Sequence, residues 1–209
     1  MPVTYEANIE RVVEIGPQTR SFFLRLPARA QLPFKPGQFL SFLLPVGGVT
    51  LTRPYTVASS PEDELLEICL NRVPNGPASG YLFSLAAGDG LRFTGPWGTF
   101  TFEQALSADC VFISEGTGIA AIRPMLRRAL ASGVKRVHLH QAAESRAHLL
   151  YATELEAAGK SFPGFVYEPL IGGSLIARIV ERYIDTDDDR SRHFYICAVG
   201  DIVPQLEVA

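Results

Sequence analysis

The stretch LTRPYTVASS, residues 51–60, brings a cation, a backbone breaker, an aromatic ring and a hydroxyl group into consecutive positions. Arg53 carries a planar guanidinium, which can bind a phosphate through two parallel hydrogen bonds. Tyr55 offers a ring that can stack on a flat ligand, and Thr56 offers a hydroxyl group. Pro54 withholds one donor from a sheet, so an ordinary edge strand would also explain the segment. The chemical interpretation is a site for a flat, anionic ligand.

A second candidate site, for phosphate, lies in NRVPNGPASGYL, residues 71–82. Gly76 makes the backbone flexible there, and we expect Ser79 to cap a short helix that ends before Gly88. The N–H groups at the start of a helix favour an anion, and the Ser79 hydroxyl would add a further donor. This segment therefore predicts a phosphate site close to the first one along the chain.

A third candidate is EGTG, residues 115–118, between an apolar run and a helical pattern. Gly116 and Gly118 let a ligand approach the backbone closely, and Thr117 adds a hydroxyl donor. Glycines needed only for packing would explain the turn equally well, because this pattern alone is a weak signal. Farther on, Cys197 in ICAVGD fits either a small buried hydrophobe or a thiol that packs against a reacting ring, rather than a nucleophile.

Several other side chains receive structural interpretations. His138 and His140 point to the same side of one predicted strand, but no third ligand is evident, so we expect no metal site. Trp97 in GPWGTF is interpreted as a core residue that closes a barrel. A basic cluster is interpreted as a solvated helix surface, with docking of an acidic partner as the alternative. The cluster comprises Arg123, Arg127, Arg128, Lys135 and Arg136.

The elements that must position these residues differ between the two halves of the chain. Up to about residue 104, short β-like runs alternate with turns rich in Pro and Gly, which is typical of an antiparallel sandwich or barrel. Beyond it, apolar strands alternate with helical patterns, which predicts a parallel sheet with helices on both faces. We therefore predict a β-barrel domain at 1–104 and an α/β domain at 105–209. Ligands of α/β domains bind beyond the carboxyl ends of the strands, where EGTG and Cys197 are expected.

Composition excludes several classes of protein. A net charge of −3 and a pI near 5.8 give no sign of binding to nucleic acid. No apolar run approaches the roughly 20 residues of a membrane span, and the N-terminus lacks the pattern of a signal peptide. Cys69, Cys110 and Cys197 are odd in number and far apart, so we expect a reducing compartment, the cytoplasm, and no iron–sulfur cluster in this chain.

Six segments, in order, resemble motifs of the ferredoxin–NADP reductase family, which includes the reductase modules of bacterial oxygenases and flavin reductases. RPYTVAS resembles its flavin motif, RVPNGPAS its pyrophosphate motif, and EGTGIAAIRPML its nicotinamide-nucleotide turn. The other three are PGQFL at 36–40, GDGLRFTGPWGTF and YICAVGDIV. The resemblance implies a flavin-binding antiparallel β-barrel followed by a nucleotide-binding α/β domain. The sequence as given stops at Ala209, before the last helix and strand that usually follow in this family.

The resemblance also implies roles for the candidate residues. Arg53 would bind the flavin diphosphate, Tyr55 would stack on the isoalloxazine beside Val57, and Thr56 would hydrogen-bond its N5 atom. Gly76 and Ser79 would hold the pyrophosphate, which favours FAD over FMN. The NAD(P)H pyrophosphate would bind the turn, and the thiol would pack against the nicotinamide when hydride passes to the flavin. These last positions are Gly116, Thr117, Gly118 and Cys197.

The expected function is transfer of electrons between NAD(P)H and an external acceptor, which would be a ferredoxin, flavodoxin, oxygenase component or free flavin. Four positions depart from the family pattern in the nicotinamide half: Glu115, Ala142, Glu144 and Ala198. They motivate the alternative, a flavin-binding electron-transfer or regulatory subunit that does not itself use NAD(P)H. The choice between NADH and NADPH, the physiological acceptor and the oligomeric state stay open.

Overall fold

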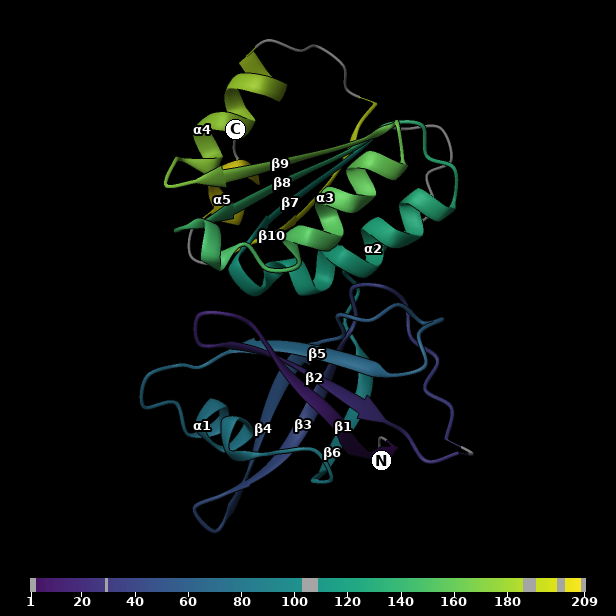
Figure 1. Ribbon diagram of the computed structural model, residues 1–209, viewed down its shortest axis with the longest axis vertical. Helices are drawn as coiled ribbons and strands as arrows, with labels where there is room; N and C mark the ends of the chain where they lie inside the picture. The colour runs from purple at the N-terminus through teal and green to yellow at the C-terminus, as the bar shows by residue number, and fades with distance from the viewer. Residues whose placement is uncertain (1–2, 29, 103–108, 186–190, 199–201, 208–209) are drawn as a thin grey trace. The chain divides into compact units, whose positions relative to one another are not determined.

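The computed structural model describes residues 3–28, 30–102, 109–185, 191–198 and 202–207 (Figure 1). The chain folds into two compact units. The first comprises Met1–Phe102 with Arg123–Met125, and the second comprises Glu103–Ile122 with Leu126–Ala209. The predicted domain boundary, between residues 104 and 105, lies outside the described residues.

The first unit is an antiparallel sheet of six strands, in the order β4-β3-β6-β1-β2-β5. An isolated bridge between Val57 and Ile68 connects the two ends of this order, because Val57 follows β4 and Ile68 lies in β5. The sheet therefore curls into the predicted barrel. Its elements are β1 (Thr4–Gly16), β2 (Thr19–Arg25), β3 (Phe39–Val46), β4 (Val49–Thr56), β5 (Leu66–Asn71), α1 (Pro77–Ser84) and β6 (Gly90–Trp97).

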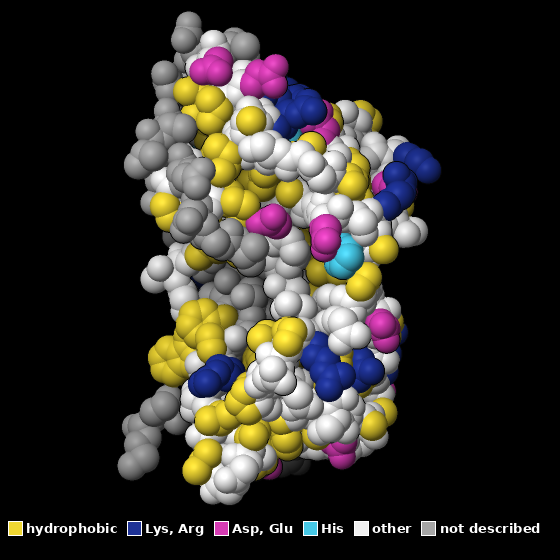
Figure 2. All heavy atoms as spheres, turned by 90° about the vertical axis from the view of Figure 1, so that its left-hand side faces the viewer, with side chains coloured by type: hydrophobic (Ala, Val, Ile, Leu, Met, Phe, Trp, Pro, Cys, Tyr) yellow, Lys and Arg dark blue, Asp and Glu magenta, His cyan; other side chains and the backbone are white. Residues whose placement is uncertain are grey.

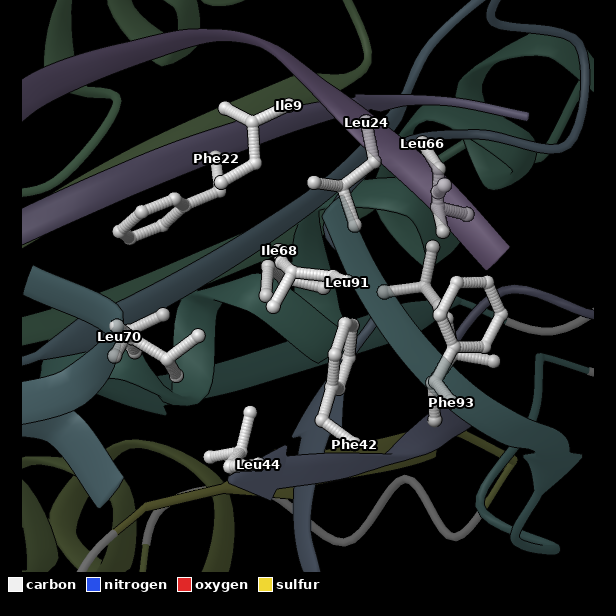
Figure 3. Close-up of a cluster of buried hydrophobic side chains, with 14 of the residues drawn as sticks. Ile9, Phe22, Leu24, Phe42, Leu44, Leu66, Ile68, Leu70, Leu91 and Phe93 are labelled. Atoms are coloured by element: carbon white, nitrogen blue, oxygen red, sulfur yellow. The ribbon is translucent and has the colours of Figure 1, made fainter. Parts of the chain in front are cut away.

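Alternation along the strands builds the core of the first unit. In TRSFFLR of β2, Phe22 and Leu24 are fully buried, whereas Arg25 is exposed. Side chains from β1, β3, β5 and β6 meet them in one apolar cluster (Figure 3). Burial of each large apolar side chain stabilises the fold by roughly 1.5–3 kcal/mol. The labelled members are Ile9, Phe22, Leu24, Phe42, Leu44, Leu66, Ile68, Leu70, Leu91 and Phe93.

The second unit is a parallel sheet of four strands, in the order β10-β7-β8-β9, as the alternating pattern predicts. Helices α2 and α3 lie on one face of the sheet and α4 and α5 on the other (Figure 1). The elements are β7 (Cys110–Glu115), α2 (Ile119–Ala131), β8 (Val137–Ala143), α3 (Ala152–Ser161), β9 (Phe165–Ile171), α4 (Leu175–Val180), β10 (His193–Cys197) and α5 (Ile202–Glu207), with short helical turns at Gly116–Gly118, Arg146–His148 and Glu181–Asp185.

Two local predictions are wrong. Helix α1 begins at Pro77 with Gly76 as its N-cap residue, so Ser79 lies inside the first turn and does not cap the helix. Proline is favoured at this first position because its φ is already helical and its missing N–H would have no partner there. Trp97 is 41% exposed and therefore is not a core residue. No helix in the described part of the chain is long and apolar enough to cross a membrane.

Candidate functional site

The strand that carries the first candidate site lies at an end of the six-stranded order. β4 pairs through its length with β3, where Arg53 stands opposite Phe42 and Tyr55 opposite Leu40. Pro54 is exposed. It lacks an N–H group, which costs the sheet no hydrogen bond where the backbone faces away from β3. The edge-strand interpretation and the ligand-site interpretation are therefore compatible, because an outer strand leaves side chains accessible.

Arg53 and Tyr55 present different chemistry along this strand. The Arg53 guanidinium is exposed and donates through Nη1 to the Thr52 carbonyl at 2.8 Å; no carboxylate among the described residues pairs with it. Tyr55 is half-buried and packs edge-on against Phe42, with ring centroids 5.8 Å apart. Burial raises the pKa of the Tyr55 hydroxyl, although the nearby Arg53 charge opposes this, so the phenol stays neutral at physiological pH.

The second candidate site is a tight turn before α1. Asn75 adopts a left-handed backbone conformation with φ of 56°. A Cβ atom on Gly76 would lie 2.8 Å from Ser79 Oγ and 2.9 Å from Val73 Cβ, so only glycine fits. The Ser79 hydroxyl is buried: it accepts from the Val73 N–H at 3.0 Å and lies 3.2 Å from the Gly76 carbonyl. The Ser79 hydroxyl therefore stabilises the turn through bonds within it.

The donors that this turn offers to an anion are backbone N–H groups. The first turn of α1 carries no acidic residue and no side-chain cap. The N–H groups of Ala78 and Ser79 precede the first intrahelical bond, from the Gly80 N–H to the Gly76 carbonyl. On the face of the first unit that Figure 2 shows, hydrophobic and Lys or Arg side chains lie side by side. The backbone donors of this turn fit the phosphates of a ligand.

The third candidate site brings EGTG and Cys197 together at the carboxyl edge of the parallel sheet. Cys197 pairs in register with Ser114, two residues before the Gly116–Gly118 turn. A Cβ atom on Gly118 would overlap the Cys197 carbonyl oxygen and lie 2.7 Å from the carbonyl carbon. Close packing against β10 therefore already requires Gly118. Burial raises the pKa of the Cys197 thiol, so it is protonated and is not a nucleophile.

Gly116 and Glu115 have opposite effects on binding of an anion at this turn. Gly116 has φ of +54°, and a Cβ atom there would meet nothing within 4 Å, so the space above the turn is open. Glu115 is half-buried and stands in register with Ala142 of β8, at the same edge. An open glycine turn suits a diphosphate, whereas an adjacent carboxylate opposes it by like-charge repulsion.

A buried polar network that the sequence did not reveal lies on the α4 face of this sheet. His140, whose side chain is 2% exposed, places Nδ1 3.1 Å from Glu168 and Nε2 2.8 Å from the Tyr183 hydroxyl. Glu168 also accepts two bonds of 2.6 Å from Arg182. The carboxylate fixes the proton on Nδ1, so Nε2 accepts from Tyr183. Only the alternation of His138 and His140 hinted at this network, and the described residues offer no group that could hold a metal ion.

This network predicts a loss of stability in mild acid. Burial lowers the pKa of His140 to about 4, with the Glu168 charge opposing the effect and Arg182 adding to it. The unfolded chain binds a proton near pH 6.5, so unfolding takes up a proton between pH 6.5 and 4 and becomes easier as the pH falls. We expect the free energy of unfolding to drop by up to about 3 kcal/mol across that window.

Urea unfolding at half-unit steps of pH measures this effect. The variant His140→Gln, which cannot take up the proton, should flatten the slope between pH 6.5 and 4. Burial raises the pKa of Glu168, but Arg182 and His140 lower it by more, so this carboxylate should still contribute a loss below pH 4.5. A variant that keeps the full slope above pH 4.5 would contradict the assignment to His140.

A second buried network involves Arg123, one of the three residues of helix α2 that group with the first unit. Arg123 donates through Nη1 to Glu67 at 2.7 Å and to the Ala58 carbonyl at 2.9 Å. The two side chains are only 12% and 3% exposed. The interpretation of Arg123 as part of a solvated basic cluster is therefore wrong, because its guanidinium forms a buried ion pair with Glu67. Arg136, another member of that cluster, pairs with Asp109 at 2.8 Å.

Comparison with known proteins gives this geometry a context. Residues 6–102 match the family model described as the oxidoreductase FAD-binding domain. Ferredoxin–NADP reductase B of Sorangium cellulosum is 29% identical over 215 residues, which cover 95% of this chain and 88% of that protein. The reductase component DmpP of phenol 2-monooxygenase from Pseudomonas sp. strain CF600 is 28% identical over 170 residues, 80% of this chain but only 47% of its own length.

The fold is also found in a solved structure. The cytochrome P450 reductase GcoB of Amycolatopsis superposes with a TM-score of 0.86 and 28% sequence identity, over 100% of this chain and 67% of GcoB. The chain thus spans most of one relative and between about half and two thirds of the other two.

Proposed function

The chain belongs to the ferredoxin–NADP reductase-like flavoproteins, and on that premise we propose that it passes electrons between NAD(P)H and an external acceptor through bound FAD. It is in this sense an NAD(P)H-dependent flavoprotein reductase. When bound, FAD supplies the chemistry: it takes up two electrons as a hydride and passes them on. The protein supplies binding, orientation and exclusion of water.

One observation carries the proposal: the segment that matches the FAD-binding model, residues 6–102, contains both candidate sites of the first unit. On an edge strand, Arg53 offers an exposed guanidinium to the diphosphate, and Tyr55 offers a half-buried ring to the isoalloxazine. Thr56, which is half-buried, follows on the same segment and is the residue proposed to bond the redox nitrogen. The Val57 side chain is fully buried in the apolar core, so only its backbone can meet the ligand. For the pyrophosphate, the Ser79 backbone N–H is the donor that we propose, because the Ser79 hydroxyl is already bonded within its turn.

For the coenzyme we propose the open turn Gly116–Thr117–Gly118 as the diphosphate site and Cys197 as the residue against the nicotinamide. The open space above Gly116 and the closeness of Gly118 to Cys197 support this assignment. The thiol acts by packing, since burial keeps it protonated. It positions a ring for hydride transfer and forms no bond to it.

The acceptor is proposed by chemical class. Relatives named as a ferredoxin reductase and as an oxygenase component favour a small electron-carrier protein or an oxygenase component over free flavin. We propose the cytoplasm as the location, since Cys69, Cys110 and Cys197 form no disulfide with one another, which suits a reducing compartment. The second candidate function, a flavin-binding subunit that does not use NAD(P)H, is favoured by the half-buried Glu115 beside the proposed coenzyme turn.

Anaerobic mixing of the FAD-loaded protein with NADH, and separately with NADPH, separates the two functions. We expect at least one coenzyme to bleach the visible absorption of the flavin. Dithionite is the control, since it reduces accessible flavin without a coenzyme site. Bleaching by dithionite but by neither coenzyme would contradict the reductase and favour the subunit. Loss of flavin during desalting would indicate instead that flavin is a passing substrate.

A further inference from the structure

The ion pair between Arg123 and Glu67 lies at the end of the strand that carries the proposed flavin residues. Glu67 is held on both carboxylate oxygens: Oε2 accepts from Arg123 at 2.7 Å, and Oε1 accepts from the buried Ser21 hydroxyl at 2.6 Å. Removing a charge of this kind from water is costly, so such a pair persists only with good geometry and further hydrogen bonds.

Three further hydrogen bonds of this network involve one short segment, Ala58 and Ser59. The Ala58 N–H donates to the Glu67 carbonyl at 2.7 Å, and the Glu67 N–H donates to Ser59 Oγ at 3.0 Å. The Ala58 carbonyl accepts from Arg123 at 2.9 Å. One guanidinium nitrogen thus binds both the carboxylate and the backbone of the segment that follows β4.

That segment continues directly from the proposed flavin residues. Ala58 follows Thr56 and Val57, and the Val57 N–H donates to the Gln38 carbonyl at 3.0 Å. The chain is therefore fixed from Val57 to Ser59, immediately beyond the residues proposed to face the isoalloxazine. A shift of the Ala58 peptide would move the Thr56 hydroxyl, because the two residues are separated only by Val57, whose side chain is fully buried.

We propose that Arg123 is a positioning residue for flavin: its bond to the Ala58 carbonyl holds Thr56 and Val57 in the conformation that binds the isoalloxazine. This inference rests on the proposed function. The simpler alternative is that Arg123 only neutralises the buried Glu67 carboxylate. The two explanations differ for a variant in which both charges are removed together. No buried carboxylate then needs a partner, but the Ala58 carbonyl still loses its donor.

The test compares wild type, Arg123→Met and the double variant Arg123→Met/Glu67→Met. Replacing a buried ion pair by apolar residues of similar volume is often neutral for stability, whereas removing one partner is not. Three quantities are measured for each: the thermal midpoint, the Kd for FAD from titration of the apoprotein, and the visible circular dichroism of the bound flavin. Binding of FAD to the wild type tests the proposed function separately.

We expect the single variant to lose thermal stability and FAD affinity. The double variant should recover most of the midpoint that the single variant loses, yet still bind FAD about tenfold more weakly, the size expected if binding must supply the free energy of the lost bond between Arg123 and the Ala58 carbonyl. A double variant with wild-type Kd and wild-type flavin dichroism would overturn the proposal. If the double variant does not fold, Arg123→Met/Glu67→Gln decides: the neutral amide keeps a partner for the Ser21 hydroxyl and needs no cation, while the Ala58 carbonyl still loses its donor, so unchanged FAD binding would also overturn the proposal.

Discussion

Replacing Arg53 by Ala is expected to raise the Kd for FAD by about tenfold to a hundredfold. The guanidinium is exposed, and no carboxylate among the described residues occupies it, so its donors are available to a diphosphate. A charge-assisted bond of this kind is worth about 1.5–3 kcal/mol, and each 1.4 kcal/mol is tenfold in affinity. Fluorescence titration of the apoprotein with FAD measures the change.

Arg25→Ala is the matched control for this prediction. It removes the same charge from another strand of the same unit, where Arg25 pairs with Glu10 and Glu64 at 2.8 Å. That variant should bind FAD as the wild type does, because surface ion pairs of this kind contribute little. Equal Kd values for Arg53→Ala and the wild type would refute the site assignment, whatever the stability of the variant.

Replacing Gly118 by Ala is expected to lower the free energy of unfolding by about 3 kcal/mol, at the upper end of what overpacking usually costs. The new Cβ atom would overlap the Cys197 carbonyl oxygen, and neither backbone can rotate away as a side chain would. The strand β10 or the turn must move, so binding of NAD(P)H should weaken as well. Urea unfolding followed by far-UV circular dichroism measures the first effect.

Two other glycines of the second unit calibrate this result. Gly116→Ala meets open space but needs φ of +54°, so it should cost about 1 kcal/mol in backbone strain alone. Gly159→Ala lies inside helix α3, also with nothing within 4 Å, and should stabilise the fold by about 0.5–1 kcal/mol. A Gly118→Ala variant no less stable than Gly116→Ala would show that the carbonyl of β10 is not fixed.

Local patterns in the sequence were sufficient to predict the fold class of both units. CVFIS is mostly apolar and forms the buried strand β7. SFFLR is a short β-like run within β2, where Phe22 and Leu24 are buried, Phe23 is half-buried and Arg25 is exposed. The order of apolar and polar residues along a strand is visible in the sequence itself, so the strands can be predicted without knowledge of tertiary contacts. The prediction that Ser79 caps the start of α1 was wrong because two signals for a helix start lie close together. Pro77, whose φ is already helical, determines the first residue of the helix, and the serine does not act as its cap.

Side-chain networks could not be predicted in this way. Arg123 and Glu67 are 56 residues apart, and no pattern around either one indicates that they meet. An arginine in a helix next to other basic residues is usually solvated, so the buried pair contradicts a reasonable expectation. The same holds for His140 and Tyr183, which are 43 residues apart. Motifs locate candidate ligands of a cofactor, whereas the partners that hold those ligands come from long-range packing.

The position of β4 at the end of the six-stranded order has a consequence for association between molecules. An outer strand with unpaired backbone groups is a template for strand addition by a second chain, and hence for aggregation. Pro54 removes an N–H from that edge, and Arg53 adds a charge that a neighbouring copy would have to bury. The residues proposed to meet the cofactor would thus also disfavour pairing of two molecules along β4 while no flavin is bound.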